Sequence, residues 1–284
     1  MSSTYRELYD RGARLLDNAG ICDYAIDSRL LLEYVCSTDR NYLLAHGDNE
    51  VDSEKESEYL ELIEKRCKHI PLQHLTKEQE FMGLRFMVNE NVLIPRQDTE
   101  CLVEEVMCDM GDGLRVLDMC TGSGCIIISL SKYKNDYEAV GVDVSEKALE
   151  VARKNAALNE VKVDFVLSDL FAGLDINNKF DVIVSNPPYI ESDVVDTLMP
   201  EVKDYEPRMA LDGDSDGLKY YRLITEEAAC YLNPGGSLYY EIGYNQAEAV
   251  KNIMEKSGFT DVCVVKDLAG LDRVVKGRKK CLIN

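Results

Sequence analysis

Residues 114–124 decide the fold, and they read LRVLDMCTGSG. The apolar run at the start of this stretch predicts a buried strand that ends in an acid, Asp118. Small residues follow, and residues 125–132 then have a helical pattern, so the stretch predicts a strand, a tight loop and a helix. Gly122 and Gly124 allow the backbone to approach a ligand closely, and the helix N-terminus favours an electron-rich group. Glycine pairs also occur in α/β turns for packing alone, so this loop does not assign a ligand by itself.

Two further strands end in acids. Residues 138–143 predict a strand that ends in Asp143, which follows the first glycine of the loop by 21 residues. An acid at this spacing is placed to accept hydrogen bonds from both hydroxyls of a ribose. Residues 163–167 predict a third strand, after which Asp169 could hold an adenine amine. Each acid alone could be a solvated strand end or a helix cap, but with Asp118 and the glycine loop they predict an adenosine site.

A rigid polar corner follows the next predicted strand, residues 180–185. It consists of Asn186, Pro187, Pro188 and Tyr189. Both prolines lack a backbone N–H and have a fixed φ, so the corner is stiff and its carbonyls are free to accept hydrogen bonds. The asparagine adds an acceptor and the tyrosine adds a flat ring. A simple strand terminator needs only one proline, so the corner predicts a cradle for a planar group that carries an NH₂.

Together these motifs resemble the class I S-adenosylmethionine-dependent methyltransferases, and within them the HemK-type glutamine-N5 methyltransferases of peptide chain release factors. The resemblance covers nearly the whole chain. The Asn-Pro-Pro-Tyr corner is shared with adenine-N6 methyltransferases, so it is only moderately specific. Further segments that match the narrower family are FMG at 81–83, IPRQDTE at 94–100, YEPR at 205–208, ALDG at 210–213, EIG at 241–243, DLAG at 267–270, and Asp272 with Arg273.

The resemblance implies an α/β fold, with a class I methyltransferase (Rossmann-like) seven-stranded sheet and an N-terminal helical bundle joined to it by a β-hairpin. We expect a helical substrate-recognition domain at residues 1–78, because its pattern is helical and it contains no catalytic motif. The hairpin linker is expected at 79–97 and the methyltransferase domain at 98–284. Within that domain we predict a helix at 218–232 and late strands that include residues 280–283.

The implied reaction is methyl transfer from S-adenosylmethionine to the side-chain nitrogen of the glutamine in the Gly-Gly-Gln motif of release factors. The oxygen of the Asn186 side chain and the Pro187 carbonyl would hold the NH₂, and Tyr189 would pack on the amide plane. The implied catalytic residues are Asn186, Pro187, Pro188 and Tyr189. The implied substrate-binding residues are Asn186, Pro187, Tyr189, Arg96 and Phe81. The implied cofactor-binding residues are Asp118, Cys120, Thr121, Gly122, Ser123, Gly124, Asp143, Asp169, Leu170 and Asn186.

Three positions depart from the family pattern. Cys120 stands where glycine is usual, Gln97-Asp98 where Pro-Glu is usual, and Leu170 where tryptophan is usual. If the backbone at Cys120 is left-handed, a side chain there costs about 1–2 kcal/mol. These departures keep a cofactor-binding module without catalysis as an alternative, although the intact Asn-Pro-Pro-Tyr corner argues against it.

The net charge of the chain indicates which class of macromolecule it binds as a substrate. The net charge is −20, and residues 1–78 alone hold 10 basic and 16 acidic residues. Nucleic-acid affinity depends on neutralising phosphates, so this balance favours a protein substrate over DNA or RNA. An adenine-N6 methyltransferase acting on DNA or RNA remains the alternative function.

The remaining residue types predict no further chemistry. The ten cysteines form no C-x-x-C pair, and Cys36, Cys67, Cys230 and Cys263 lie in apolar stretches, as expected of reduced, partly buried thiols. The three histidines do not pair with cysteines or acids at metal-binding spacing, so no metal is expected. Neither a long apolar stretch nor an apolar signal segment is present, so we expect a cytoplasmic protein without membrane partners.

Overall fold

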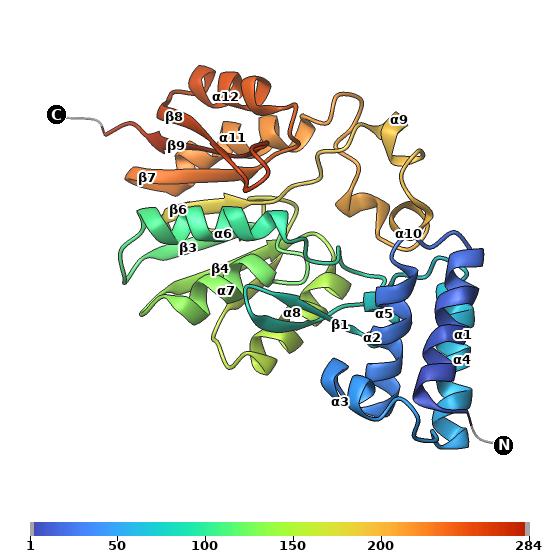
Figure 1. Cartoon of the computed structure of the whole chain (residues 1–284). Coiled ribbons are helices and arrows are strands. Elements are labelled where there is room, and N and C mark those ends of the chain that lie inside the picture. Colours follow the sequence, from blue (N-terminus) through green and yellow to red (C-terminus); the bar gives the residue numbers. More distant parts are fainter. Residues whose placement is uncertain (1–2, 282–284) are drawn as a thin grey trace. The chain divides into compact units, whose positions relative to one another are not determined.

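The computed structural model describes residues 3–281, and these divide into two compact units (Figure 1). The first unit contains the residues up to Lys77 together with Met199–Tyr205. The second contains Glu78–Leu198 and the residues from Glu206 onward. The hairpin therefore belongs to the second unit, and one short segment of the expected methyltransferase domain belongs to the first.

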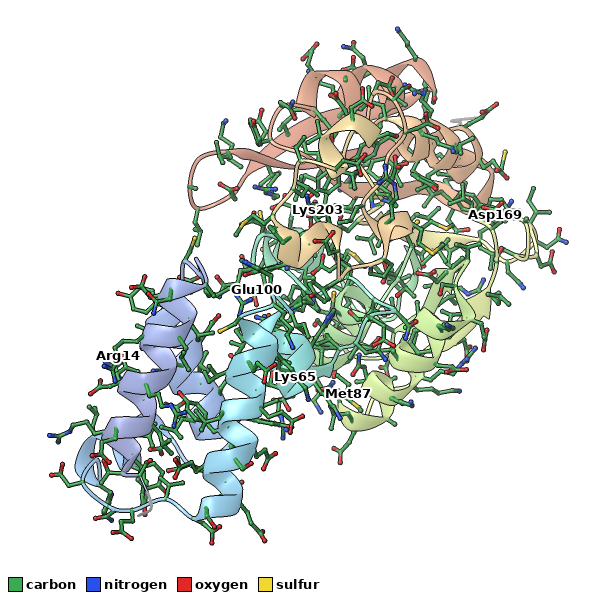
Figure 2. The ribbon with its side chains drawn as sticks, turned by 90° about the vertical axis from the view of Figure 1, so that its right-hand side faces the viewer. Arg14, Lys65, Met87, Glu100, Asp169 and Lys203 are labelled. Carbon is green, nitrogen blue, oxygen red and sulfur yellow. The ribbon has the colours of Figure 1, made fainter. Side chains whose placement is uncertain are left out.

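The first unit is helical. Its helices are α1 (Tyr5–Asn18), α2 (Tyr24–Cys36), α3 (Arg40–Ala45), α4 (Ser53–Arg66), α5 (Leu72–Thr76) and the short α10 (Pro200–Lys203). Helices α1, α2 and α4 pack side by side (Figure 1), and Gly12 of α1 allows the close approach. A Cβ atom at Gly12 would lie 1.9 Å from the Tyr59 hydroxyl oxygen. That hydroxyl instead forms a buried hydrogen bond of 2.8 Å with Ser28 Oγ. Charged side chains such as Arg14 are exposed on the outside of the unit (Figure 2).

A buried ion-pair cluster ties Met199–Tyr205 to the helices of the first unit. Arg66 Nε donates to Asp27 Oδ2 at 2.7 Å, and Arg66 Nη2 donates to Glu201 Oε1 at 2.5 Å. Burial raises the pKa of Asp27, while the Arg66 guanidinium acts in the opposite direction. Removing one member of such a cluster leaves an unpaired buried charge, which costs about 3–5 kcal/mol.

The second unit is a seven-stranded sheet with helices on both faces (Figure 1). The strand order is β5-β4-β3-β6-β7-β9-β8; all neighbours up to β7 are parallel, and β9 runs antiparallel to β7 and β8. The strands of the sheet are β3 (Arg115–Met119), β4 (Glu138–Asp143), β5 (Asp164–Leu167), β6 (Phe180–Ser185), β7 (Leu232–Glu241), β8 (Phe259–Lys266) and β9 (Asp272–Lys279). The hairpin strands are β1 (Glu78–Phe81) and β2 (Leu84–Met87). The helical elements are α6 (Asp98–Asp109), α7 (Cys125–Tyr133), α8 (Glu146–Leu158), α9 (Ser192–Val195), the 3₁₀ helix η1 (Arg208–Ala210), α11 (Lys219–Tyr231) and α12 (Ala247–Lys256).

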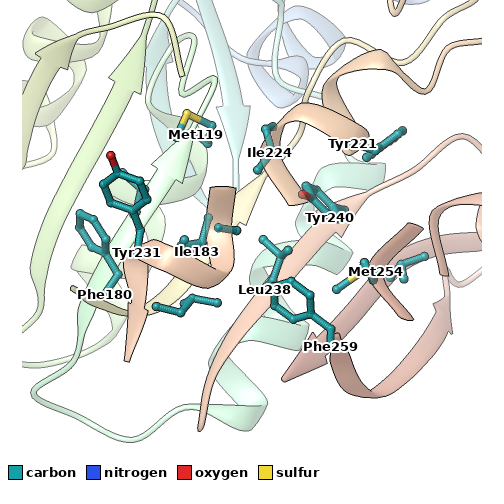
Figure 3. Packing of buried hydrophobic residues seen from close by; sticks show 14 of the residues in the cluster. Met119, Phe180, Ile183, Tyr221, Ile224, Tyr231, Leu238, Tyr240, Met254 and Phe259 are labelled. Carbon is teal, nitrogen blue, oxygen red and sulfur yellow. The ribbon is translucent and has the colours of Figure 1, made fainter. Parts of the chain in front are cut away.

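Both faces of the sheet are buried, which explains the continuous apolar runs of its strands. Alternate residues of β6 face opposite layers: Val182 and Val184 join the cluster formed with α6 and α7, whereas Ile183 joins the cluster formed with α11 and α12. Tyr239 and Tyr240 of β7 divide in the same way. Figure 3 shows the second layer, in which Ile183 and Tyr240 lie among side chains of α11 and α12.

Two sequence-based expectations need correction. Among the described residues the last strand is β9 at Asp272–Lys279. Of the strand predicted at 280–283, Lys280 and Cys281 are not in a strand, and the other two residues lie outside the described part. Val274 and Val275 fit the inner position of β9, because their side chains enter opposite core layers.

The second correction concerns the cysteines. Cys36 is buried and Cys67 partly buried, as expected, but Cys230 and Cys263 are exposed. Cys263 lies on β8, the edge strand of the sheet, where an apolar sequence run does not ensure burial of both faces. All ten cysteines lie in the described residues and are free thiols.

Candidate active site

A cavity of about 370 Å³ lies in the second unit, beyond the carboxyl ends of β3, β4, β5 and β6. Strands β4 and β6 flank β3, so the chain order reverses here, and open α/β sheets bind ligands at such a switch point. The sequence-predicted residues that line the cavity are Arg96, Cys120, Thr121, Gly122, Ser123, Asp143, Asp169, Leu170, Asn186 and Pro188. The predicted residues that are not part of its lining are Phe81, Asp118, Gly124, Pro187 and Tyr189.

The loop after β3 forms one wall of the cavity. Its backbone is left-handed at Cys120, Gly122 and Gly124, with φ values of 63°, 56° and 80°. Open space surrounds the position where a Cβ of Gly122 would stand, so a ligand can approach the backbone there. At Cys120 the left-handed geometry gives the side chain the strain that glycine would avoid.

Asp118 lies beneath this loop. Its Oδ2 accepts a hydrogen bond of 2.6 Å from Thr121 Oγ1, and its Oδ1 has no partner among the described residues. The side chain is fully buried, and burial raises the pKa of Asp118 to about 7. Its observed contact is therefore with the loop and not with the cavity.

Asp143 stands at the end of β4 and faces the cavity. Its Oδ2 accepts from the Gly122 N–H and its Oδ1 from the Ser145 N–H, both at 2.9 Å. Burial raises the pKa of Asp143, and the backbone N–H groups oppose that rise. Two backbone donors thus hold the carboxylate in one orientation, and each oxygen retains capacity to accept from a ligand.

The segment after β5 forms the adjoining wall. Asp169 is exposed (Figure 2), and Leu170 has a left-handed φ of 47°. Ser168 fixes this turn, because its hydroxyl donates to the Leu170 carbonyl at 2.8 Å and accepts from the Gly173 N–H at 2.7 Å. An acidic and an apolar side chain therefore stand next to each other at the cavity edge.

The Asn-Pro-Pro-Tyr corner follows β6, as predicted, but its members differ in position. Asn186 and Pro188 line the cavity, whereas Pro187 is buried without lining it. The ring of Tyr189 packs against the core cluster of α11 and α12, and its hydroxyl donates to Glu241 Oε1 at 3.3 Å. In this geometry Tyr189 anchors the corner from behind.

Two further residues join this corner, and the sequence did not identify them individually. Asn186 Nδ2 donates to Thr99 Oγ1 at 3.3 Å. Glu241, at the end of β7, is buried, and burial raises the pKa of its carboxyl group to about 7. Thr99 and Glu241 belong to the segments at 94–100 and 241–243, which match the family pattern as whole segments. An acid that ends an apolar strand, as Asp118 does, was the signal that could have identified Glu241.

Arg96 also lines the cavity. Its Nη2 donates to both carboxylate oxygens of Glu206, at 2.8 and 2.7 Å. Burial raises the pKa of Glu206, while the Arg96 guanidinium lowers it. Phe81, by contrast, is buried in the core, with its ring edge-on to Phe86 at a centroid distance of 6.0 Å.

Residues 3–281 contain no group of three or more His, Cys, Asp or Glu side chains placed to hold a metal ion. Among the helices in that range, none is long and apolar enough to cross a membrane.

Comparison with solved structures identifies the fold. A methyltransferase from Pyrococcus furiosus superposes with a TM-score of 0.54 at 18% identity, covering 81% of this chain and 100% of that one. A Thermus thermophilus 16S rRNA methyltransferase, solved in complex with AdoMet and guanosine, gives a TM-score of 0.51 at 19% identity, covering 72% and 50%. At these identities the likeness concerns the fold alone, and it confirms the predicted class I methyltransferase architecture.

Comparison of sequences identifies the family. The PrmC N-terminal domain matches residues 7–76, and the methyltransferase small domain matches residues 97–201. The release factor glutamine methyltransferase of Clostridium acetobutylicum is 43% identical over 257 residues, which cover 89% of this chain and 90% of the relative. The enzyme of the same name from Geobacter sulfurreducens is 41% identical over 275 residues, covering 97% and 96%. Because such relatives match over almost their whole length, this chain belongs to the release factor glutamine methyltransferase family.

Proposed function

We propose that this methyltransferase transfers a methyl group from S-adenosylmethionine to the side-chain nitrogen of the glutamine in the Gly-Gly-Gln motif of peptide chain release factors. The reaction would support translation termination, and the proposed substrate implies a cytoplasmic location. The observation that carries the proposal is that Asp143 and Asn186 line one cavity, so a cofactor site and an amide site adjoin.

The walls of the cavity suit the cofactor. Asp143 would accept from the ribose hydroxyls, since backbone N–H groups already hold its carboxylate. Leu170 offers an apolar wall for adenine and Asp169 an acceptor for its amine. When bound, S-adenosylmethionine supplies an electrophilic methyl group on a positively charged sulfur, and the acidic walls favour that charge.

The Asn-Pro-Pro-Tyr corner would position the substrate. A glutamine side-chain nitrogen is a poor nucleophile, because its lone pair is delocalised into the carbonyl. The oxygen of Asn186 and the carbonyl of Pro187 would accept from its NH₂ and turn the face of the nitrogen toward the methyl group. The reacting atoms would then lie about 3–3.5 Å apart, as efficient transfer requires. One N–H of the substrate would be replaced by N–CH₃ and its proton released, while the bond between the methyl group and the sulfur would break and leave the sulfur as a neutral thioether.

Mass spectrometry of a purified release factor, incubated with the enzyme and S-adenosylmethionine, tests this proposal. We expect one added methyl group on the glutamine of the Gly-Gly-Gln motif. Replacing that glutamine by glutamate is the matched control, and it should abolish labelling because a carboxylate has no NH₂. Methyl transfer to adenine in DNA or RNA, with the release factor unmodified, would instead support the alternative.

We also propose that the helical unit docks the release factor, because it has its own core and contains none of the residues that line the cavity. A variant that starts at Glu78 should still bind S-adenosylmethionine and methylate a short Gly-Gly-Gln peptide, but it should lose most activity on the intact factor. Since Met199–Tyr205 belongs to the deleted unit, cofactor binding by this variant is measured first. Full activity on the intact factor would contradict the docking role.

A further inference from the structure

A buried carboxyl group contacts the Asn-Pro-Pro-Tyr corner from behind. Glu241 is the last residue of β7, and its side chain is 1% exposed. Its Oε1 accepts a hydrogen bond from the Tyr189 hydroxyl, so it is joined to the last residue of the corner. Strand β7 pairs with β6, which leads directly into the corner. Glu241 is therefore on the strand next to the one that carries Asn186.

Thr99 joins the same carboxyl group to the first residue of the corner. Thr99 is 2% exposed, and its hydroxyl accepts from Asn186 Nδ2 at 3.3 Å. The Thr99 side chain also lies near Glu241 and acts to lower the pKa of that carboxyl group. Glu241 Oε2 has no hydrogen-bond partner among the described residues, so it is free to accept one. The hydrogen of the Thr99 hydroxyl can rotate, so it can be directed to this oxygen.

We propose that Glu241 is a positioning residue that sets the orientation of the Asn186 side-chain amide through the hydroxyl of Thr99. This inference rests on the proposed function, because it concerns the group that would hold the substrate amide. An ionised carboxylate can only accept hydrogen bonds, so the Thr99 hydroxyl donates to Glu241 and offers its lone pair to Asn186. Asn186 must then present its NH₂ to Thr99, which leaves its oxygen free to accept from the NH₂ of a substrate glutamine.

Protonation of Glu241 allows the opposite arrangement. A neutral carboxyl group can donate to Thr99, which can then donate to the oxygen of Asn186. The NH₂ of Asn186 would face the cavity, where it cannot accept a hydrogen bond from another NH₂. Because burial raises the pKa of Glu241 to about 7, this change would fall near neutral pH. Turnover should therefore increase as pH rises through this range and then level off.

The surroundings of Glu241 bear on this titration. Arg273 of β9 favours the ionised form of the carboxyl group, whereas Asp98 of α6 opposes it. Arg273 Nη2 lies 3.0 Å from Asp98 Oδ2, so the two charges partly offset each other. The Tyr221 hydroxyl of α11 donates to the backbone oxygen of Glu241 at 2.9 Å. Burial also raises the pKa of the Cys125 thiol of α7 to about 12, so that group stays neutral in the relevant range.

Glu241→Gln tests the proposal in the full-length enzyme. The turnover number should fall by about 10-fold to 100-fold, as for a misplaced reacting group. Its decline at acid pH should disappear, while the dissociation constant for S-adenosylmethionine stays unchanged. A purely structural role would lower the turnover number, raise the dissociation constant for S-adenosylmethionine and leave the shape of the pH profile as it is. Wild-type turnover with the same acid decline in Glu241→Gln would overturn the proposal.

Thr99 provides a matched pair of variants that also covers the case in which Glu241→Gln fails to fold. Thr99→Val keeps the shape of the side chain but removes the hydroxyl, and it should lower turnover as much as Glu241→Gln does. Thr99→Ser restores the hydroxyl and should restore turnover. The double variant Thr99→Val with Glu241→Gln should be no slower than either single variant, because each change interrupts the same relay, the path from Glu241 through the Thr99 hydroxyl to Asn186. Equal turnover of the Val and Ser variants would contradict the relay.

The pKa of Glu241 can be measured without any catalysis. Carbon NMR of the Glu241 carboxyl group in the isolated protein should show a titration near neutral pH, and Thr99→Val should shift it upward because a donor to the ionised form is lost. A carboxyl signal with an ordinary acidic titration would overturn the inference. If the wild type methylates no release factor, the proposed function fails; if it does and these variants behave like the wild type, only the positioning role fails.

Discussion

Two buried carboxyl groups lie under the two halves of the cavity, and they invite direct comparison. Asp118 of β3 is below the cofactor loop, and Glu241 of β7 is below the Asn-Pro-Pro-Tyr corner. Burial raises the pKa of each to about 7, and one oxygen of each has no partner among the described residues. The other oxygen accepts from a hydroxyl, that of Thr121 or of Tyr189.

The difference lies in what each carboxyl group reaches. Asp118 holds a loop whose backbone forms the wall of the proposed cofactor site, so its effect should be on cofactor affinity and stability. Glu241 contacts Tyr189 of the corner, and in our proposal it orients Asn186 through Thr99, so its effect should be on turnover. The two carboxyl groups have similar burial and similar pKa values, but they should affect different steps, namely cofactor binding and methyl transfer.

The largest expected effect concerns the amide corner itself. Asn186→Ala removes one acceptor of the NH₂ being methylated and should lower turnover by about 10²–10³, as for loss of one preorganised polar contact. The affinity for S-adenosylmethionine, measured by calorimetry, should change little. Asn91→Ala is the matched control, since Asn91 also lines the cavity but its side chain bonds to Asn89 and Glu90 and not to the corner, and its turnover should stay near wild type. Equal losses in both variants would show that the corner has no special part.

Substitutions in the cofactor half of the cavity should change the affinity for S-adenosylmethionine instead of the turnover number. Asp143→Ala removes the acceptor of the ribose hydroxyls and should weaken S-adenosylmethionine binding by about 1–3 kcal/mol, or about 5-fold to 150-fold. Turnover at saturating cofactor should change far less. Asp169→Ala should have a weaker effect of the same kind, because adenine also has apolar walls. Unchanged affinity in Asp143→Ala, measured by calorimetry, would rule out its assigned role.

The two carboxyl groups can also be separated by their effects on stability. The folded-state pKa of Asp118, about 7, is above its ordinary value of 3.8, so the folded protein binds more protons between these values. Its contribution therefore favours folding at low pH and is lost as pH rises from about 4 to about 7. Asp118→Asn should remove this slope, a change of about 4 kcal/mol in the free energy of unfolding across this pH range.

Urea unfolding at several pH values measures this slope. Asp118→Asn should keep the acid decline of turnover that Glu241→Gln loses, which would confirm that the two groups act on different steps. If Asp118→Asn also removed that decline, the two carboxyl groups could not be distinguished in this way.

The sequence predicted most of the fold, because the strands of a two-sided sheet read as apolar runs that end in acids or glycines. It placed the loop at 119–124 and the corner at 186–189 at the ends of strands, where the structure has them. It could not predict that Glu241 contacts Tyr189 or that Thr99 contacts Asn186, since these contacts depend on the pairing of β6 with β7 and on a hydroxyl from α6. Contacts between segments distant in sequence leave no local pattern.

The same reason explains two other differences between the structure and the expectations from the sequence. Phe81 belongs to a motif of the family, but its burial against Phe86 follows from how the hairpin packs. Met199–Tyr205 joins the helical unit through Arg66 and Glu201, an ion pair between residues 135 positions apart. Neither arrangement could be read from residue type or spacing.

The smallest expected effect concerns the strained backbone of the cofactor loop. Cys120 has a φ of 63°, which costs a side chain about 1–2 kcal/mol, whereas glycine adopts it freely. Cys120→Gly should therefore stabilise the protein by about 0.5–1 kcal/mol, because the added flexibility of glycine in the unfolded chain offsets part of the gain.

Cys120→Ala is the matched control, since it keeps a side chain at the strained position and should give no gain. Turnover should be unchanged in Cys120→Gly, because the amide corner is not altered. Denaturant unfolding of the two variants measures the difference. If alanine stabilised the protein as much as glycine did, the thiol of Cys120 and not its left-handed backbone would be the source of strain.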